Sequence, residues 1–257
     1  MKAVILAGGF GTRLSEETIV RPKPMVEVGG LPILWHVMKI YSAHGIDDFI
    51  VCCGYKGEMI KEYFSGYAMR RADMTVDMAQ NEIELHSKCL EPWRVTLIDT
   101  GQDTMTGGRL RRVADYIGDE TFCFTYGDGV ADIDITKLIA FHHAKERMAT
   151  LTAVRPPGRF GAFTLAADQD RIVAFKEKPD GDGAWVNGGY FVLEPAAIGY
   201  IESDVSIWEH KPLERLARDG ELSAFRHDGF WQPMDTLHDR MVLEQMWEAD
   251  NTPWKVW

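Results

Sequence analysis

Short apolar runs alternate with amphipathic segments through the first half of the chain. The pattern predicts strands at residues 3–7, 48–53, 95–99 and 122–126, and helices at residues 33–43, 56–64 and 106–116. In the first of these helices the apolar residues recur at the three- and four-residue spacing of one helical face. Strands that alternate with helices are typical of a parallel sheet covered on both faces.

Shorter strands, separated by turn-forming residues, are predicted in the second half. They lie at residues 149–154, 162–165, 172–176, 188–193 and 222–226, with helices at 195–201, 213–219 and 237–249. Proline and glycine at 156–158 and 179–183 indicate loops. Because no repeat, low-complexity tract or linker interrupts the chain, we expect one α/β domain over residues 1–257, divided near residue 130. Its sheet should be mixed but mostly parallel.

Composition narrows the class of protein. The chain has 257 residues, is 46% apolar and carries a formal net charge of -11, which disfavours binding to nucleic acid backbones and anionic membranes. Its cysteines fit neither a zinc pattern nor a disulfide framework, so we expect reduced structural thiols. No stretch approaches the ~20 apolar residues of a membrane span. The apolar run at 3–7 is shorter than the about 7–15 residues of a signal peptide, so we expect a cytoplasmic protein.

The most informative stretch is Leu6-Ala7-Gly8-Gly9-Phe10-Gly11-Thr12-Arg13-Leu14, where a strand runs into three glycines. Glycines let a ligand approach the main chain, and consecutive free N–H groups form a cradle for phosphate oxygens. Arg13 would add a forked cation. Neither the dinucleotide fingerprint nor the ATPase phosphate loop matches, and a tight turn without a ligand is the structural alternative.

Lys23 and two aspartates are further candidates for phosphate chemistry. Lys23 lies between two prolines, which stiffen the segment that would aim its charge. Asp128 follows a predicted strand, at the sheet edge where open α/β sheets bind ligands, although Gly-Asp-Gly is equally typical of a turn. Asp235 precedes the last helix and could instead be its N-cap. A hard cation such as Mg²⁺ takes one or two carboxylates together with phosphate oxygens.

Together, the segments G-G-F-G-T-R-L (8–14) and P-K-P-M-V-E-V-G-G (22–30) resemble the signature of the sugar nucleotidyltransferases, also called nucleoside-diphosphate-sugar pyrophosphorylases. This family has a Rossmann-like α/β fold. The resemblance spans nearly the whole chain, and the segments 34–39, 52–57, 91–93 and 230–236 resemble its cytidylyl branch.

The resemblance implies a nucleotide-binding half, residues 1–130, and a β-rich sugar-phosphate-binding half, residues 131–257. It implies that Mg²⁺ is held by Asp128 and Asp235, and that Arg13, Lys23 and Asp128 are catalytic. Arg109, with Arg111 and Arg112, could instead form a solvated helix face. The implied nucleotide contacts are Leu6, Ala7, Gly8, Gly9, Phe10, Gly11, Thr12, Arg13, Lys23, Thr104, Arg109 and Asp128, and the implied sugar-phosphate contacts are Gly161, Glu177, Lys178 and Asn187.

The activity implied by the resemblance is in-line attack of a hexose 1-phosphate on the α-phosphate of a nucleoside triphosphate. The cytidylyl branch implies CTP and glucose 1-phosphate as substrates, CDP-glucose as product and a role in carbohydrate biosynthesis such as that of the O-antigen. UTP or dTTP as the triphosphate and a non-catalytic nucleotide-sugar sensor are the alternatives, and a dehydrogenase is disfavoured by the missing third glycine. The family also implies a homo-oligomer, for which a hexamer is one candidate.

Two other groups of side chains are candidates for a role. The histidines are scattered, and His142-His143 is typical of a helix surface. The tryptophans near the end, at 247, 254 and 257, either pack on a partner subunit or cover the chain's own core, since large aromatic side chains dominate both settings.

Overall fold

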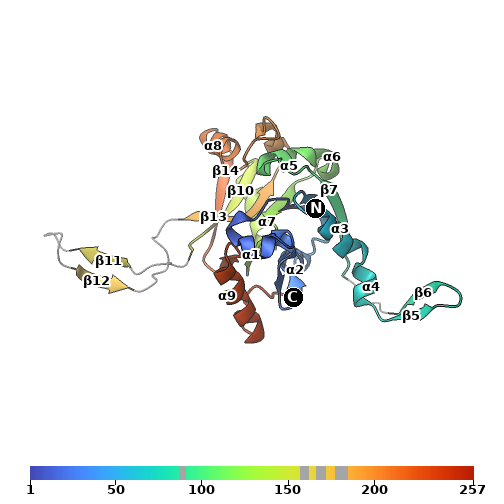
Figure 1. Cartoon of the computed structure of the whole chain (residues 1–257). Helices are drawn as coiled ribbons and strands as arrows, with labels where there is room; N and C mark the ends of the chain where they lie inside the picture. Colours follow the sequence, from blue (N-terminus) through green and yellow to red (C-terminus); the bar gives the residue numbers. More distant parts are fainter. Residues whose placement is uncertain (87–90, 157–161, 166–171, 177–184) are drawn as a thin grey trace.

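A seven-stranded sheet forms the centre of the protein in a computed structural model that describes residues 1–86, 91–156, 162–165, 172–176 and 185–257 (Figure 1). In spatial order the strands are β14 (Leu222–His227), β10 (Ala149–Val154), β13 (Val186–Leu193), β8 (Phe122–Tyr126), β1 (Ala3–Ala7), β4 (Asp48–Cys53) and β7 (Arg94–Asp99). Strand β13 is antiparallel to β8 and β10, and the other neighbouring pairs are parallel. The predicted mixed, mostly parallel sheet is therefore confirmed.

Both faces of this sheet are covered, because alternate residues of each strand point to opposite sides. Along β1, Ala3, Ile5 and Ala7 enter one core cluster, whereas Val4 and Leu6 enter the other. The first cluster is closed by α2 (Ile33–Ser42), α3 (Gly57–Ser65), α7 (Ile135–Lys145) and α9 (Leu237–Glu248). The second is closed by α5 (Thr106–Arg112), α6 (Ala114–Ile117), η3 (Pro195–Tyr200) and α8 (Lys211–Arg218).

Several elements differ from the sequence prediction. The helix expected at 106–116 is two helices, α5 and α6, and the segment at 195–201 forms a 3-10 helix rather than an α-helix. Helix α7 was not predicted at all. The remaining elements are short: η1 (Thr12–Leu14), α1 (Ser15–Thr18), η2 (Lys23–Met25), β2 (Glu27–Val28), β3 (Leu31–Pro32), α4 (Tyr67–Arg71), β9 (Gly129–Ala131), β11 (Ala162–Leu165), β12 (Ile172–Lys176) and β15 (Trp231–Pro233).

A two-stranded ribbon, β5 (Met74–Asp77) and β6 (Glu82–Leu85), projects away from the body (Figure 1). Met74 pairs with Leu85 and Val76 pairs with Ile83, so these four apolar side chains share one face. Their exposed fractions run from 37% to 51%. We call these four residues the apolar ribbon face. An isolated hairpin of this kind is marginally stable in water.

The C-terminal tryptophans cover the chain's own core. Trp254 is fully buried, and Trp247 and Trp257 pack against the first core cluster. The buried ring of His36 lies among them, with Nε2 at 2.9 Å from the Val28 carbonyl oxygen. Burial holds the pKa of His36 at about 4, so the ring packs as a neutral group.

The structure tests the sequence expectations for the cysteines and for His142. Cys52, Cys53 and Cys123 are buried free thiols, as expected. His142, expected on a helix surface, is instead buried, and its ring nitrogens lie 2.9 Å from Thr150 Oγ1 and 3.1 Å from Glu194 Oε1. Within the described ranges, every helix is too short or too polar to span a bilayer.

Candidate active site

The glycine loop leaves strand β1 at the edge where the parallel strands end. The Gly8 carbonyl oxygen accepts hydrogen bonds from Tyr55 N at 3.1 Å and from Arg109 Nη2 at 2.9 Å. A Cβ placed on Gly9 would meet no atom within 4 Å, and Gly11 has a φ of +62°, which disfavours other residues. The loop is thus anchored at Gly8 and open at Gly9.

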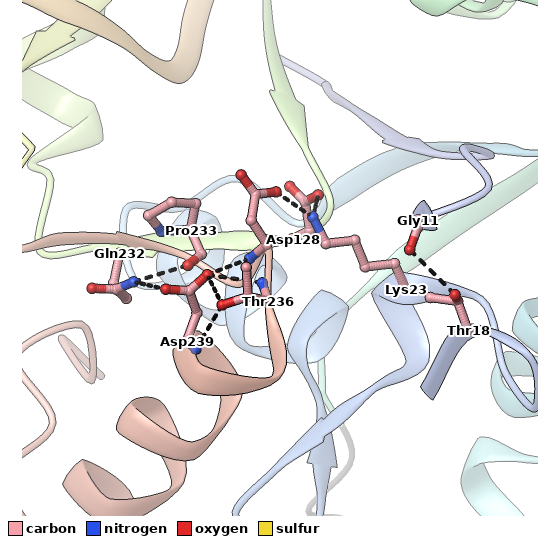
Figure 2. Close-up of polar contacts among 9 residues, drawn as sticks. Gly11, Thr18, Lys23, Asp128, Gln232, Pro233, Thr236 and Asp239 are labelled. Atoms are coloured by element: carbon pink, nitrogen blue, oxygen red, sulfur yellow. Dashed lines mark hydrogen bonds and ion pairs between the residues drawn. The ribbon is translucent and has the colours of Figure 1, made fainter. Parts of the chain in front are cut away.

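Lys23 is the cation at the centre of the site. It begins η2 directly after Pro22, and its residue is buried, with an exposed fraction of 9%. Its Nζ lies 2.6 Å from Asp128 Oδ2 and 2.7 Å from Asp235 Oδ1 (Figure 2). Burial lowers the pKa of Lys23, but the charges and hydrogen bonds of Asp128 and Asp235 outweigh this and raise it. The ammonium group is therefore charged.

A short strand pair brings the two aspartates together. Asp128 lies in the turn between β8 and β9, and β9 pairs with β15 so that Gly129 is opposite Pro233. Met234 N also donates to the Asp128 carbonyl oxygen at 2.8 Å. Two carboxylates that are distant in sequence consequently face one ammonium group.

Asp235 is not the N-cap of the last helix, which was the structural alternative for it. Thr236 is the N-cap of α9, in a capping box with Asp239. Asp239 Oδ2 accepts from Asp235 N at 3.1 Å and from Thr236 N at 2.8 Å, and Oδ1 accepts from Gln232 Nε2 at 3.2 Å (Figure 2). The helix start thereby fixes the main chain that carries Asp235.

A cavity of about 470 Å³ opens beside this centre. Asp128, Asp235 and Gly9 line it together with Asn187, the one predicted sugar contact that lies within the described ranges. The other lining residues are Leu6, Thr106, Thr125, Tyr126, Gly129, Gly188, Gly189, Tyr190, Glu209, Trp231 and Pro233. The cavity therefore joins residues from both halves of the chain.

Sequence reasoning missed part of this wall. Tyr126 was given no role, although its position at the end of the predicted strand 122–126, two residues before Asp128, was an available signal. Glu209 lies between η3 and α8, where no local pattern marks it. The structure brings Glu209 to the cavity through contacts that are distant in sequence.

Arg109 is buried, so the solvated helix face considered for it is wrong. Its exposed fraction is 4%, and its guanidinium donates to the carbonyl oxygens of Gly8, Cys53, Gly101 and Gln102, and to the Thr100 hydroxyl. It ties the glycine loop to the ends of β4 and β7. A nucleotide contact by Arg109 stays a prediction, as does one by Thr104, which is buried and does not line the cavity.

Some of the other predicted contact residues lie within the described part of the chain, and others lie outside it. Phe10 is exposed and packs on Tyr55 with ring centroids 5.3 Å apart, and Thr12 is exposed in η1. Ala7 is buried at the end of β1. The main chain of Arg13 lies in η1, while its side chain is outside the description. Also outside the described residues are Gly161, Glu177 and Lys178.

The two aspartates form a donor set that fits a divalent cation. Both carboxylates already converge on one cation, the Lys23 ammonium. In the described part of the chain, no cluster of three or more His, Cys, Asp or Glu side chains suits a metal. A Mg²⁺ ion does not need such a cluster, because one or two carboxylates suffice when phosphate oxygens and waters complete the coordination.

Comparisons with known proteins identify relatives of this chain. The nucleotidyl transferase family model matches residues 2–232. A glucose-1-phosphate cytidylyltransferase of Salmonella typhimurium is 63% identical over 258 residues, which cover all of both chains, and a relative in Bacillus subtilis is 45% identical over the same coverage. The structure of HddC from Yersinia pseudotuberculosis superposes with a TM-score of 0.69 at 22% identity, over 96% of this chain and 99% of that one.

Proposed function

Because the chain belongs to the nucleotidyl transferase family, we propose that it transfers the cytidylyl group of CTP to glucose 1-phosphate, giving CDP-glucose and pyrophosphate. The observation that carries this proposal is the 63% identity, over the whole of both chains, to the Salmonella glucose-1-phosphate cytidylyltransferase. Identity of this extent includes the nucleotide half and the sugar half, so both substrates are expected to be shared.

The reaction needs little acid–base chemistry from the protein. A phosphate oxygen of glucose 1-phosphate attacks the α-phosphorus of CTP, the new P–O bond forms, and the bond to the β-phosphate breaks to release pyrophosphate. The attacking oxygen is already ionised near neutral pH. The protein must mainly align two anions and offset their repulsion, and preplaced charges and dipoles serve both purposes.

Individual residues are assigned to these tasks. The glycine loop, open at Gly9 and anchored at Gly8, would offer main-chain N–H groups to the triphosphate, with Arg13 as an added cation. Lys23 would screen the phosphates, since its charged ammonium contacts Asp128 and Asp235, which line the cavity. The family resemblance further implies that Glu177 bonds the sugar hydroxyls and that Lys178 holds the sugar phosphate.

Mg²⁺ is the cofactor we assign to this site. Asp128 and Asp235 would hold it, and when bound it neutralises phosphate charge at the reacting phosphorus. Two carboxylates facing one ammonium leave a net negative charge, which by itself repels a triphosphate. A divalent ion makes the same cluster net positive, which explains why a cation is needed there.

The decisive experiment is a panel of CTP, UTP and dTTP with glucose 1-phosphate, with and without Mg²⁺, in which released pyrophosphate is measured. We expect turnover with CTP and Mg²⁺ and much slower turnover with the other triphosphates. Faster turnover with UTP or dTTP would reassign the base specificity. Binding of CTP without turnover in the presence of Mg²⁺ would support the nucleotide-sugar sensor.

A homo-oligomer is the assembly we propose, in keeping with the family resemblance. The apolar ribbon face supports it, because four exposed apolar side chains on a projecting hairpin gain stability when a second copy covers them. Hexamer formation and a cytoplasmic location remain predictions. Light scattering that shows a monomer at working concentration would contradict the proposed assembly.

A further inference from the structure

Glu209 is a carboxylate of the cavity wall that the proposed metal site does not use. It follows Trp208, whose side chain is fully buried in the second core cluster. Trp208 N donates to Thr106 Oγ1 at 2.9 Å, so the main chain next to Glu209 is held to the start of α5. The carboxylate is therefore presented to the cavity from a rigid part of the fold.

Two hydroxyl groups fix the orientation of this carboxylate. Thr106 Oγ1 donates to Oε2 at 2.6 Å, and Tyr126 Oη donates to Oε1 at 2.5 Å. The Tyr126 hydroxyl in turn accepts from Asn187 Nδ2 at 3.2 Å. Burial, and then the charge of Glu209, raise the pKa of Tyr126, so its proton stays in the bond to Glu209.

The ring of Tyr126 reaches this position because Gly189 makes room for it. Gly189 has a φ of +81°, and a Cβ there would lie 2.6 Å from Tyr126 Cδ2. The chain thus combines a glycine, a tyrosine and a threonine to hold one carboxylate at the cavity. Such positioning is typical of a group that must meet a ligand in a defined direction.

The chemistry of Glu209 indicates what kind of ligand group it meets. An ionised carboxylate offers about four acceptor sites, and Tyr126 and Thr106 use one on each oxygen. Both donors are neutral, so the negative charge is not balanced by these contacts. Phosphate groups would be repelled, whereas a hydroxyl group can donate to a remaining lone pair.

We infer that Glu209 accepts a hydrogen bond from a hydroxyl group of a bound substrate and thereby selects hydroxylated substrates. This inference rests on the proposed function, in which both the hexose and the ribose carry hydroxyl groups. Hydrogen bonds to charged groups contribute about 1.5–3 kcal/mol, so losing this one should reduce kcat/KM roughly 10- to 150-fold.

The test compares Glu209→Gln with wild type on substrates that lack single hydroxyl groups. The hexose arm uses 2-, 3-, 4- and 6-deoxyglucose 1-phosphate with CTP, and the ribose arm uses 2′-deoxy- and 3′-deoxy-CTP with glucose 1-phosphate. Glutamine keeps the size of the side chain but removes its charge and one acceptor. Glu214→Gln, on the exposed face of α8, is the matched control and should behave as wild type.

We expect Glu209→Gln to have a lower kcat/KM than wild type on the full substrates. On the one deoxy analogue that lacks the bonded hydroxyl group, the variant and wild type should have nearly the same kcat/KM. If that analogue is a deoxyhexose, the bonded hydroxyl belongs to the sugar; if it is a deoxynucleotide, the hydroxyl belongs to the ribose. An equal loss on every analogue, or no loss on any, would overturn the inference.

A further variant and the wild-type control separate other causes of failure. Glu209→Asp keeps the charge, but its shorter side chain cannot reach the hydroxyl group. Its loss of kcat/KM should therefore also disappear on the same deoxy analogue, and this variant serves as the test if Glu209→Gln does not fold. Absence of wild-type turnover with CTP and glucose 1-phosphate would contradict the proposed function itself. Turnover by wild type without hydroxyl dependence would contradict only the role of Glu209.

Discussion

Replacing Asp239 by alanine tests whether the start of α9 positions Asp235, the second carboxylate of the proposed metal site. Asp239 is 7% exposed, and its two oxygens accept four hydrogen bonds. Two of them come from the main-chain N–H groups of Asp235 and Thr236. Alanine removes both acceptor oxygens, and with them all four hydrogen bonds, but leaves the Thr236 hydroxyl able to cap the helix.

The magnitude follows from the two main-chain groups that lose their partner. Each buried N–H without an acceptor costs about 1–3 kcal/mol, and water can reach part of a helix start, so we expect a total of roughly 2–4 kcal/mol. For a chain of this size that corresponds to a fall in Tm of roughly 4–16 °C. A misplacement of Asp235 by about 1 Å would lower turnover roughly 100-fold.

The assay combines thermal unfolding, followed by circular dichroism, with pyrophosphate release measured well below Tm. Glu248→Ala, an exposed carboxylate at the other end of α9, is the control and should leave both quantities near wild type. If Asp239→Ala melts earlier but turns over normally, Asp239 stabilises the helix without positioning Asp235. An unchanged Tm would refute the stabilising role of the capping box as well.

Three other variants test separate parts of the structure. Asp128→Asn should lower turnover roughly 100- to 1,000-fold with an unchanged fold, as other losses of preorganised charge do; a near-normal rate in this variant would remove Asp128 from the mechanism. EDTA should abolish wild-type turnover until Mg²⁺ is restored. Arg109→Lys should lower Tm by roughly 4–8 °C, since at least two of its hydrogen bonds, including that to Gly8, are lost at about 1 kcal/mol each; an unchanged melting curve would contradict this. The double variant Val76→Lys, Ile83→Glu replaces two side chains of the apolar ribbon face by an oppositely charged cross-strand pair. Light scattering should then show smaller assemblies than wild type; an assembly of unchanged mass would exclude that face as the interface.

The sequence allowed the sheet and the centre of the site to be predicted where the signals are local. Continuous apolar runs mark the buried parallel strands, and the glycines after β1 mark the open loop at Gly9. Lys23 and Asp128 could also be predicted, because two prolines restrict the main chain at Lys23 and because Asp128 closely follows the buried apolar strand β8. Asp235 came from the family resemblance rather than from any local pattern.

What could not be predicted depends on contacts between distant segments. Strand β15 has three residues and includes a proline, so only its pairing with β9 makes it a strand. Arg109 reads as part of a basic helix face until the fold places carbonyl oxygens around its guanidinium. Glu209 likewise gains its place at the cavity only from the hydroxyl groups of Thr106 and Tyr126.

The pairing of β9 with β15 also has a consequence for how the protein is made. During synthesis on the ribosome, Lys23 and Asp128 emerge long before Asp235, so the three charges cannot meet until the last part of the chain is available. Closing so large a loop is entropically unfavourable and slow compared with forming helices. A nascent or prematurely terminated chain would therefore keep Lys23 beside a single carboxylate and would lack half of the proposed cation site.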